Sequence, residues 1–184
     1  MKEKWPGMLL GLALLVSQGC GGVTPLVAEK PPVPLAKANP EAVFRENEGL
    51  AVVWEDAKDA RDFYRGGVQQ KARAEMKSRE KAPAEALKLY QSSNDFFTRL
   101  LQFIPEDTAE YPLYEGTQIV FMPTLLMADN YLQMGKIQRD MGREGPAQSN
   151  WKNAQGSLKK SLQAERTEWG LSLEKELALL SKGN

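Results

Sequence analysis

Hydrophobic residues recur at spacings of three and four along most of residues 40–184, which is the period of amphipathic helices. The pattern starts after Asn39-Pro40-Glu41, residues that suit the capped and positively polarised first turn of a helix. One mostly apolar helix face follows, made of Val43, Asn47, Leu50, Trp54, Ala57, Arg61, Tyr64 and Val68. Gly49 and the Gly66-Gly67 pair can end or bend this helix, which we expect to continue to about Arg79.

A second periodic segment starts at Pro83 and is ended by Pro105. Its apolar residues form two adjacent stripes, a width expected of a helix that packs on two neighbours. The stripes are Leu87, Tyr90, Asn94, Phe97, Leu101 and Ile104, and Leu89, Ser93, Phe96, Leu100 and Phe103. Residues 105–116 are acidic and rich in turn-forming residues, so we expect a loop there.

A third helix is predicted from about Thr117 to Met141, where Pro123 either kinks the helix or marks its true start. Gly142 and Gly145-Pro146 then interrupt the chain. The last helical unit runs from Ala147 past Gly170, with apolar positions at Trp151, Ala154, Leu158, Leu162, Leu173, Leu177 and Leu180. No run of alternating β-branched residues is long enough for a strand, so the sequence predicts an all-α fold of antiparallel helical hairpins.

Residues 1–20 follow a different pattern, typical of a secretory signal peptide. Lys2 and Lys4 form a positive head, and the apolar run at 5–16 is shorter than the about 20 residues that cross a bilayer. The exit Ser17-Gln18-Gly19-Cys20 resembles a bacterial lipoprotein cleavage site, whose cysteine is acylated and becomes the first mature residue. That family prefers leucine where this chain has Ser17, and the small-x-small pattern also fits ordinary signal-peptidase cleavage and plain secretion.

The lipoprotein resemblance implies that residues 1–19 are removed and that acyl chains on Cys20 anchor the protein in a membrane. Cys20 is the only cysteine, which fits lipidation, and the other interpretation is an incidental buried thiol. Residues 20–39 are rich in proline and lack any period, so we interpret them as an extended linker before the helical domain at 40–184. Gly21 is not the aspartate that retains enteric lipoproteins in the inner membrane, an analogy that favours the outer membrane, facing the periplasm.

Composition narrows the chemistry that this chain can perform. Its 24 basic and 24 acidic side chains balance, so no net charge attracts nucleic acid. It has no histidine, which excludes histidine-based nucleophile systems and histidine-ligated metal sites. Neither phosphate-binding glycine motif occurs. We therefore predict a protein without metal or cofactor that is not an enzyme; the alternative is a cell-wall hydrolase using carboxylates at Glu106 and Asp107, or at Glu55, Asp56 and Asp59.

Two segments carry charge of one sign. Residues 65–81 hold six basic and two acidic side chains, and residues 106–115 hold four acidic and no basic ones. They are either a docking surface for anionic headgroups or a partner, or a solvated helix face and loop. Trp54, Trp151 and Trp169 lie on apolar stripes, where packing in the core is expected.

Small residues followed by an aromatic one recur along the chain. Ala60-x-x-Phe63 precedes Ala86-x-x-x-Tyr90, and Ala128-x-x-Tyr131 precedes Ala147-x-x-x-Trp151-x-x-Ala154. This pattern resembles the tetratricopeptide repeat, although that family's period of about 34 residues is not kept, and a plain antiparallel bundle is the alternative. The resemblance implies a partner-binding groove lined by the first helix of each pair, at Arg61, Tyr64, Arg65, Asp129, Leu132 and Gln133. The alternative is that these six are ordinary surface positions.

These features predict a lipid-anchored interaction or scaffold protein of the cell envelope that binds protein partners in the periplasm. One alternative is a ligand-binding accessory subunit of an envelope transport system, which predicts an enclosed apolar cavity among the helices. The hydrolase alternative predicts two acids about 5–10 Å apart in a cleft.

Overall fold

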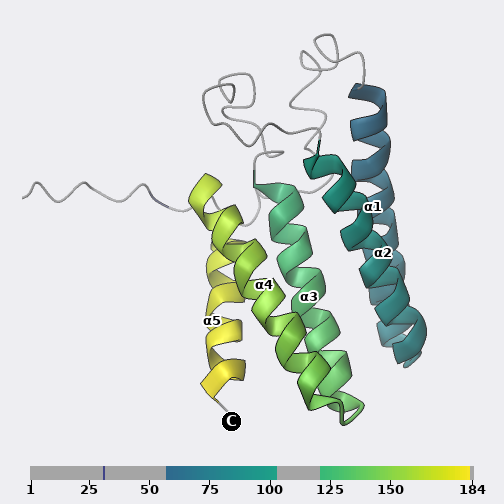
Figure 1. Ribbon diagram of the computed structural model, residues 1–184, viewed down its shortest axis with the longest axis vertical. Helices are drawn as coiled ribbons and strands as arrows, with labels where there is room; N and C mark the ends of the chain where they lie inside the picture. Colours follow the sequence, from purple (N-terminus) through teal and green to yellow (C-terminus); the bar gives the residue numbers. More distant parts are fainter. Residues whose placement is uncertain (1–30, 32–56, 103–120, 183–184) are drawn as a thin grey trace, which may run out of the picture.

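The computed structural model describes Pro31, residues 57–102 and residues 121–182. This part of the chain is 88% helical and contains no strands, which confirms the all-α prediction (Figure 1). Its helices are α1 (Ala57–Arg79), α2 (Pro83–Leu101), α3 (Met122–Asp140), α4 (Glu144–Ala164) and α5 (Glu168–Lys182). The predicted signal peptide at 1–19, Cys20, the linker at 20–39, the helix start at residue 39 and the acidic segment at 106–115 lie outside the described residues.

The helices form a stack of antiparallel hairpins. α1 packs on α2, and α3 packs on α4; α2 joins the two hairpins through α3, and α5 packs mainly on α4. In Figure 1, α2 and α4 lie in front of α1, α3 and α5, so the stack has two layers. We call α1, α3 and α5 the odd-helix layer. A stacked array of this kind presents each layer as an extended surface.

The two hairpins turn in the same way. Lys81 after α1 and Gly142 after α3 both have positive φ, 58° and 74°. The amide groups of the next residues, Ala82 and Arg143, bond back to the preceding helix, as in a Schellman motif. Ala82 and Arg143 then lead into α2 and α4 with almost equal dihedrals (φ −104°, ψ 70° and φ −103°, ψ 73°). Each position of the first hairpin therefore has a counterpart in the second, at the same separation in sequence as Ala82 and Arg143.

Counterpart positions carry the pattern of small and aromatic residues that the sequence showed. Ala86 in α2 and Ala147 in α4 are counterparts, and both are fully buried. Four residues further on, Tyr90 and Trp151 are also counterparts, and both are buried. The prediction that Trp151 lies in the core is confirmed. The repeated hairpin favours an array over a plain bundle, because a bundle has no reason to reuse one turn geometry and one packing pattern.

The start of the predicted repeat was aligned wrongly. With Ala82 matched to Arg143, the counterpart of Ala128 is Gly67 and not Ala60. A Cβ atom on Gly67 would lie 2.5 Å from the ring of Phe97, so only glycine allows α1 and α2 to approach this closely. Spacing between alanines did not reveal this position, because glycine fills the small site in the first hairpin.

Two predicted helix starts are resolved by the structure. α2 begins at Pro83, as expected. Pro123 lies in the first turn of α3 and marks the helix start rather than a kink. Gly145-Pro146 was expected to interrupt the chain, but α4 already begins at Glu144 and takes both residues into its first turn. Proline is tolerated there because the first amide groups of a helix have no partner within the helix.

The predicted continuous last helix is wrong, because α4 and α5 are separate. α4 ends at Ala164, and Glu165 adopts extended dihedrals (φ −152°, ψ 131°). The Gly170 amide then donates a 2.9 Å hydrogen bond to Oγ1 of Thr167, which places Thr167 at the start of α5. The sequence did hold a signal for this start, since Thr167 is followed by Glu168, an acid suited to the first helical turn.

Buried apolar residues form two clusters along the first hairpin. The large cluster includes Tyr64, Phe97 and Leu100 with most of the buried residues of α3, α4 and α5. The small cluster lies nearer the α1–α2 turn and consists of Ala74, Ala86, Tyr90 and Met134, with half-buried neighbours. Between these clusters, the buried side chains of α1 and α2 are polar, and Asp129 and Asn130 of α3 contact them.

Candidate functional site

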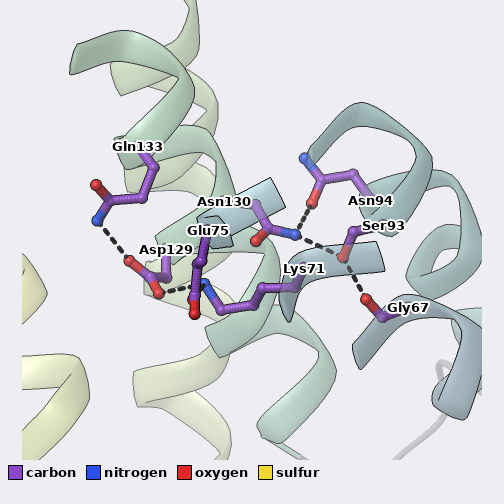
Figure 2. A network of polar contacts seen from close by, with 8 residues as sticks. All are labelled: Gly67, Lys71, Glu75, Ser93, Asn94, Asp129, Asn130 and Gln133. Atoms are coloured by element: carbon purple, nitrogen blue, oxygen red, sulfur yellow. Dashed lines mark hydrogen bonds and ion pairs between the residues drawn. The ribbon is translucent and has the colours of Figure 1, made fainter. Parts of the chain in front are cut away.

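A set of polar side chains crosses the core between the two apolar clusters. We call it the polar layer: Lys71 of α1, Ser93 and Asn94 of α2, and Asp129 and Asn130 of α3 (Figure 2). All five are buried. Buried polar groups are costly unless they are paired, so the partners of each decide what the layer can do.

Lys71 is held by two carboxylates. Its Nζ atom donates to Oδ2 of Asp129 at 2.5 Å and lies 3.0 Å from Oε1 of Glu75, one turn further along α1. It also lies 5.7 Å from the centre of the Tyr90 ring. Burial opposes the charge on Lys71, but Asp129 and Glu75 outweigh it and raise the pKa of this lysine above its usual value. Gln133 donates to the second oxygen of Asp129 at 3.0 Å.

Asparagine and serine side chains connect the same three helices. Nδ2 of Asn130 donates to Oγ of Ser93 at 2.8 Å and to Oδ1 of Asn94 at 2.9 Å. Oγ of Ser93 in turn donates to the backbone carbonyl of Gly67 at 2.7 Å. Figure 2 shows this chain of contacts beside the Lys71–Asp129 pair. The layer therefore ties α3 to both α1 and α2.

The contacts of the polar layer suit the joining of helices rather than catalysis within the layer. A lysine whose pKa is raised stays protonated at neutral pH, so it is neither a nucleophile nor a general base. Its donors already bind carboxylates within the protein. Among the described residues, no three His, Cys, Asp or Glu side chains gather as a metal site.

Sequence reasoning missed Lys71 as an internal residue. It was counted in the basic run at 65–81, where a solvated side chain is the ordinary expectation. The available signal was its place on the apolar stripe of α1, three residues after Val68. Ser93 and Asn94 were placed on the apolar stripes of α2, but their common partner Asn130 could not be read from local spacing.

Two of the six predicted groove residues belong to the core, so the predicted groove is wrong at these positions. Tyr64 is 3% exposed and packs on Phe97, with ring centres 5.9 Å apart. Leu132 is fully buried in the large cluster. The resemblance to the tetratricopeptide repeat predicts both on an accessible face, but in this structure both are buried in the large cluster.

The other four predicted groove residues are placed differently from one another. Arg65 is exposed on α1 and Gln133 is half-buried on α3, so both are accessible. Asp129 is buried and paired with Lys71. Arg61 lies in α1, but its side chain is outside the described part.

The basic run on α1 is partly neutralised within the protein. Lys77 pairs with Glu80 at 2.8 Å and with Glu85 at 3.5 Å, and Lys71 is paired as described. The remaining basic residues of the run are exposed: Arg65, Arg73, Arg79 and Lys81. Because the partners and the exposed positions are spread around α1, the run fits a solvated helix better than one concentrated docking patch.

The odd-helix layer carries a second ion pair between neighbouring helices. Nζ of Lys136 in α3 lies 2.5 Å from Oε1 of Glu176 in α5, and both side chains are partly exposed. α1 and α3 are bridged by Lys71 and Asp129. Charged contacts therefore connect each adjacent pair of helices in this layer, at one buried and one solvated site.

A pocket of about 460 Å³ lies between α4 and α5. Most of its lining residues are of polar types: Gln148, Ser149, Trp151, Lys152, Gln155 and Ser181. Trp151 offers little surface to it, because its indole ring is buried against α3 and lies under Arg139, whose guanidinium carbon is 5.3 Å from the ring centre. This pocket is open to solvent, so it is not the enclosed apolar cavity that a ligand-binding subunit predicts.

The carboxylates of the hydrolase alternative lie outside the part of the chain that the structure describes. The residues are Glu55, Asp56, Glu106 and Asp107, together with the side chain of Asp59.

Among the helices that the structure describes, none combines the length and the apolar character needed to cross a membrane.

The described part of the chain is thus an all-α stack of hairpins, with one hairpin geometry used twice and a polar layer where the two meet. Comparison with protein-family models, with curated proteins and with solved structures finds no significant match.

Proposed function

We propose that this protein is a lipid-anchored scaffold of the cell envelope, which binds protein partners on its odd-helix layer and catalyses no reaction. Its N-terminus supplies the anchor through the predicted acylation of Cys20, and the proline-rich linker holds the helical domain away from the membrane. The outer membrane, with the domain facing the periplasm, is the proposed location.

The stacked hairpin array is the observation that carries this proposal. Stacked hairpins expose long helix surfaces that suit partner recognition. In the odd-helix layer, accessible polar side chains come from all of its helices: Arg65 and Glu75 of α1, Gln133 and Lys136 of α3, and Glu176 of α5. Ion pairs hold Glu75, Lys136 and Glu176 in place on this surface, which lowers the entropic cost of binding.

The test compares two doubly substituted proteins that carry the same changes in charge on opposite layers. The tagged full-length lipoprotein is purified from native membranes, together with Arg65→Glu/Gln133→Lys on the odd-helix layer. The matched control is Lys88→Glu/Gln163→Lys, at exposed positions of α2 and α4. We expect a stoichiometric partner with the unsubstituted protein and with the control, and its loss from the odd-layer variant.

Partner loss from both variants, or from neither, would place binding elsewhere and overturn the assignment of the odd-helix layer. Absence of any stoichiometric partner would overturn the scaffold function itself. Circular dichroism of both variants checks that the helical content is equal.

The anchor is tested separately by treating cells with globomycin and measuring the intact mass of the protein. We expect the precursor to accumulate on treatment, and the untreated protein to begin at an acylated Cys20. A processed chain with an unmodified Cys20 would contradict lipidation.

A further inference from the structure

Whether or not the odd-helix layer binds a partner, the polar layer has a role within the fold. It interrupts the core at one level of the stack. In α1, Lys71 lies between Val68, which packs on the large cluster, and Ala74 of the small cluster. In α2, Ser93 and Asn94 lie between Tyr90 and Phe97 in the same way. Apolar contacts therefore hold both ends of this hairpin on its neighbour, and polar contacts hold its middle.

The repeated hairpin shows what these positions hold when no polar contact is made. Lys71 has Leu132 as its counterpart, and Leu132 is fully buried. Ser93 has Ala154, which is also fully buried. The hairpin geometry therefore accepts apolar residues at these positions, and folding of a hairpin does not require the polar ones.

Asp129 completes the comparison, since its counterpart in the first hairpin is the half-buried Val68. Each member of the Lys71–Asp129 pair thus has an apolar residue at the matching position of the other hairpin. Removing two charges from water offsets most of the attraction between them, so a buried pair adds little net stability. Leaving either charge buried without the other is costly.

The high cost of an unpaired buried charge distinguishes the observed packing of the hairpins from packings shifted along the helix axes. A slip of α1 toward the N-terminus of α3 by one helical turn, about 5.4 Å, would move Lys71 from Asp129 to the level of Leu125 and Leu126. Both leucines are buried, so in an apolar environment the lysine would lose Asp129 and keep only Glu75 of its own helix. An all-apolar contact would tolerate such a slip far better, because apolar attraction has no direction.

We propose that the polar layer fixes the register in which the α1–α2 hairpin packs on α3, and that it contributes uniqueness of arrangement rather than stability. Lys71 and Asp129 set the position along the helix axes. Asn130, through its bonds to Ser93 and Asn94, sets the position of α2 at the same level. Figure 2 shows both sets of contacts meeting on one turn of α3.

The test replaces each charged residue by its counterpart from the other hairpin. Lys71→Leu, Asp129→Val and the double variant are made in the full chain carrying Cys20→Ser, so that spin labels react only at introduced cysteines. One label pair, at Thr98 and Lys159, reports the distance between hairpins. A second pair, at Arg73 and Lys88, reports the distance within the first hairpin, and all four positions are exposed.

We expect each single variant to lower the Tm, by about 10 °C for Lys71→Leu, which leaves Asp129 buried without its cation. The double variant is expected to recover the Tm of the parent protein or to exceed it. Its distance distribution between hairpins should broaden or split, while the distribution within the hairpin stays narrow. Such a combination of restored stability and lost uniqueness is the signature of a register-fixing contact.

Three results would overturn the proposal. A double variant as unstable as the single ones, or one that does not fold, would show that the layer supplies stability. An unchanged, narrow distribution between hairpins in a stable double variant would show that the apolar clusters alone fix the register. Equal broadening of both label pairs would show general loosening of the helices.

Discussion

Gly135 of α3 offers the sharpest test of how the second hairpin is packed. A Cβ atom built on Gly135 would lie within 3.0 Å of three atoms of the Trp151 ring, whereas ordinary van der Waals contact begins at 3.4 Å. The indole ring cannot easily withdraw, because it is buried and Arg139 covers its face. Gly135→Ala should therefore force α3 and α4 apart.

Two opposing effects set the size of the change. Overpacking a close helix contact costs about 3 kcal/mol at the upper end of the usual range. Alanine in place of glycine within a helix recovers about 1 kcal/mol. The net expectation is a loss of about 2 kcal/mol in the free energy of unfolding. In a chain of this length, that loss corresponds to a fall in Tm of about 4–8 °C.

The assay is thermal and urea denaturation followed by far-ultraviolet circular dichroism. Gly156→Ala in α4 is the matched control, because a Cβ atom there would meet nothing within 4 Å. The control should gain about 0.5–1 kcal/mol from helix propensity alone. The same chemical change should thus have opposite signs at Gly135 and Gly156.

The first hairpin suggests a second substitution that should restore part of the stability lost in Gly135→Ala. Ala74 and Tyr90 are the counterparts of Gly135 and Trp151, and they pack together in the small cluster. Gly135→Ala/Trp151→Tyr should therefore be more stable than Gly135→Ala alone. A Gly135→Ala protein at least as stable as its parent would refute the close contact, and so would a double variant without any rescue.

Three further predictions concern the core and the polar layer. Leu177→Ala should cost about 2–4 kcal/mol, because this leucine is 2% exposed, whereas Leu179→Ala, at 73% exposure on the same helix, should change the free energy of unfolding by less than about 0.5 kcal/mol; urea denaturation of both proteins tests the docking of α5. Asn130→Ala should lower the free energy of unfolding by about 2–4 kcal/mol, through lost hydrogen bonds and the space left behind. Asn153→Ala, on the exposed face of α4, should lower it by about 0.5 kcal/mol or less. Calorimetry measures both variants, and similar values would contradict the role of Asn130 in the polar layer. The pKa of Lys71 is raised in the folded protein, so protonation of this lysine favours the folded state. Its contribution to the free energy of unfolding is fully present below the ordinary lysine pKa of about 10.4 and is lost as the pH rises through the higher folded value. Urea titrations at increasing alkaline pH should show this loss, and a steeper loss in Lys71→Leu/Asp129→Val than in the parent would contradict it.

Most of the helical structure could be predicted from local spacing. Periods of three and four residues located α2 and α3 well, and Pro83 marked the start of α2. The break between α4 and α5 was missed because apolar positions continue in phase across it. There, the Thr167 cap and its bond to Gly170 outweighed the continuous pattern.

The proposed functional surface was harder to predict, because it depends on which side of each helix meets a neighbour. The repeat resemblance carried Tyr64 and Leu132 onto an open groove, and both pack in the core instead. Lys71 shows the reverse error, since a lysine in a basic run was expected in solvent and is buried. Its partner Asp129 lies on another helix, in the other hairpin, beyond the reach of any helical period.

The order of residues was sufficient to predict the all-α fold that the structure confirms and to exclude histidine chemistry, because these follow from composition and from spacings within one or two helical turns. The signal peptide stays a prediction from the same local pattern. The matching of positions between the two hairpins, the glycine contacts with Phe97 and Trp151, and the polar layer emerged only when the helices were packed. Helical periodicity is a local property, since it links residues three and four positions apart. Pairing between helices instead depends on their relative rotation and displacement, and in this protein one buried ion pair and two side-chain hydrogen bonds hold both at the junction of the hairpins.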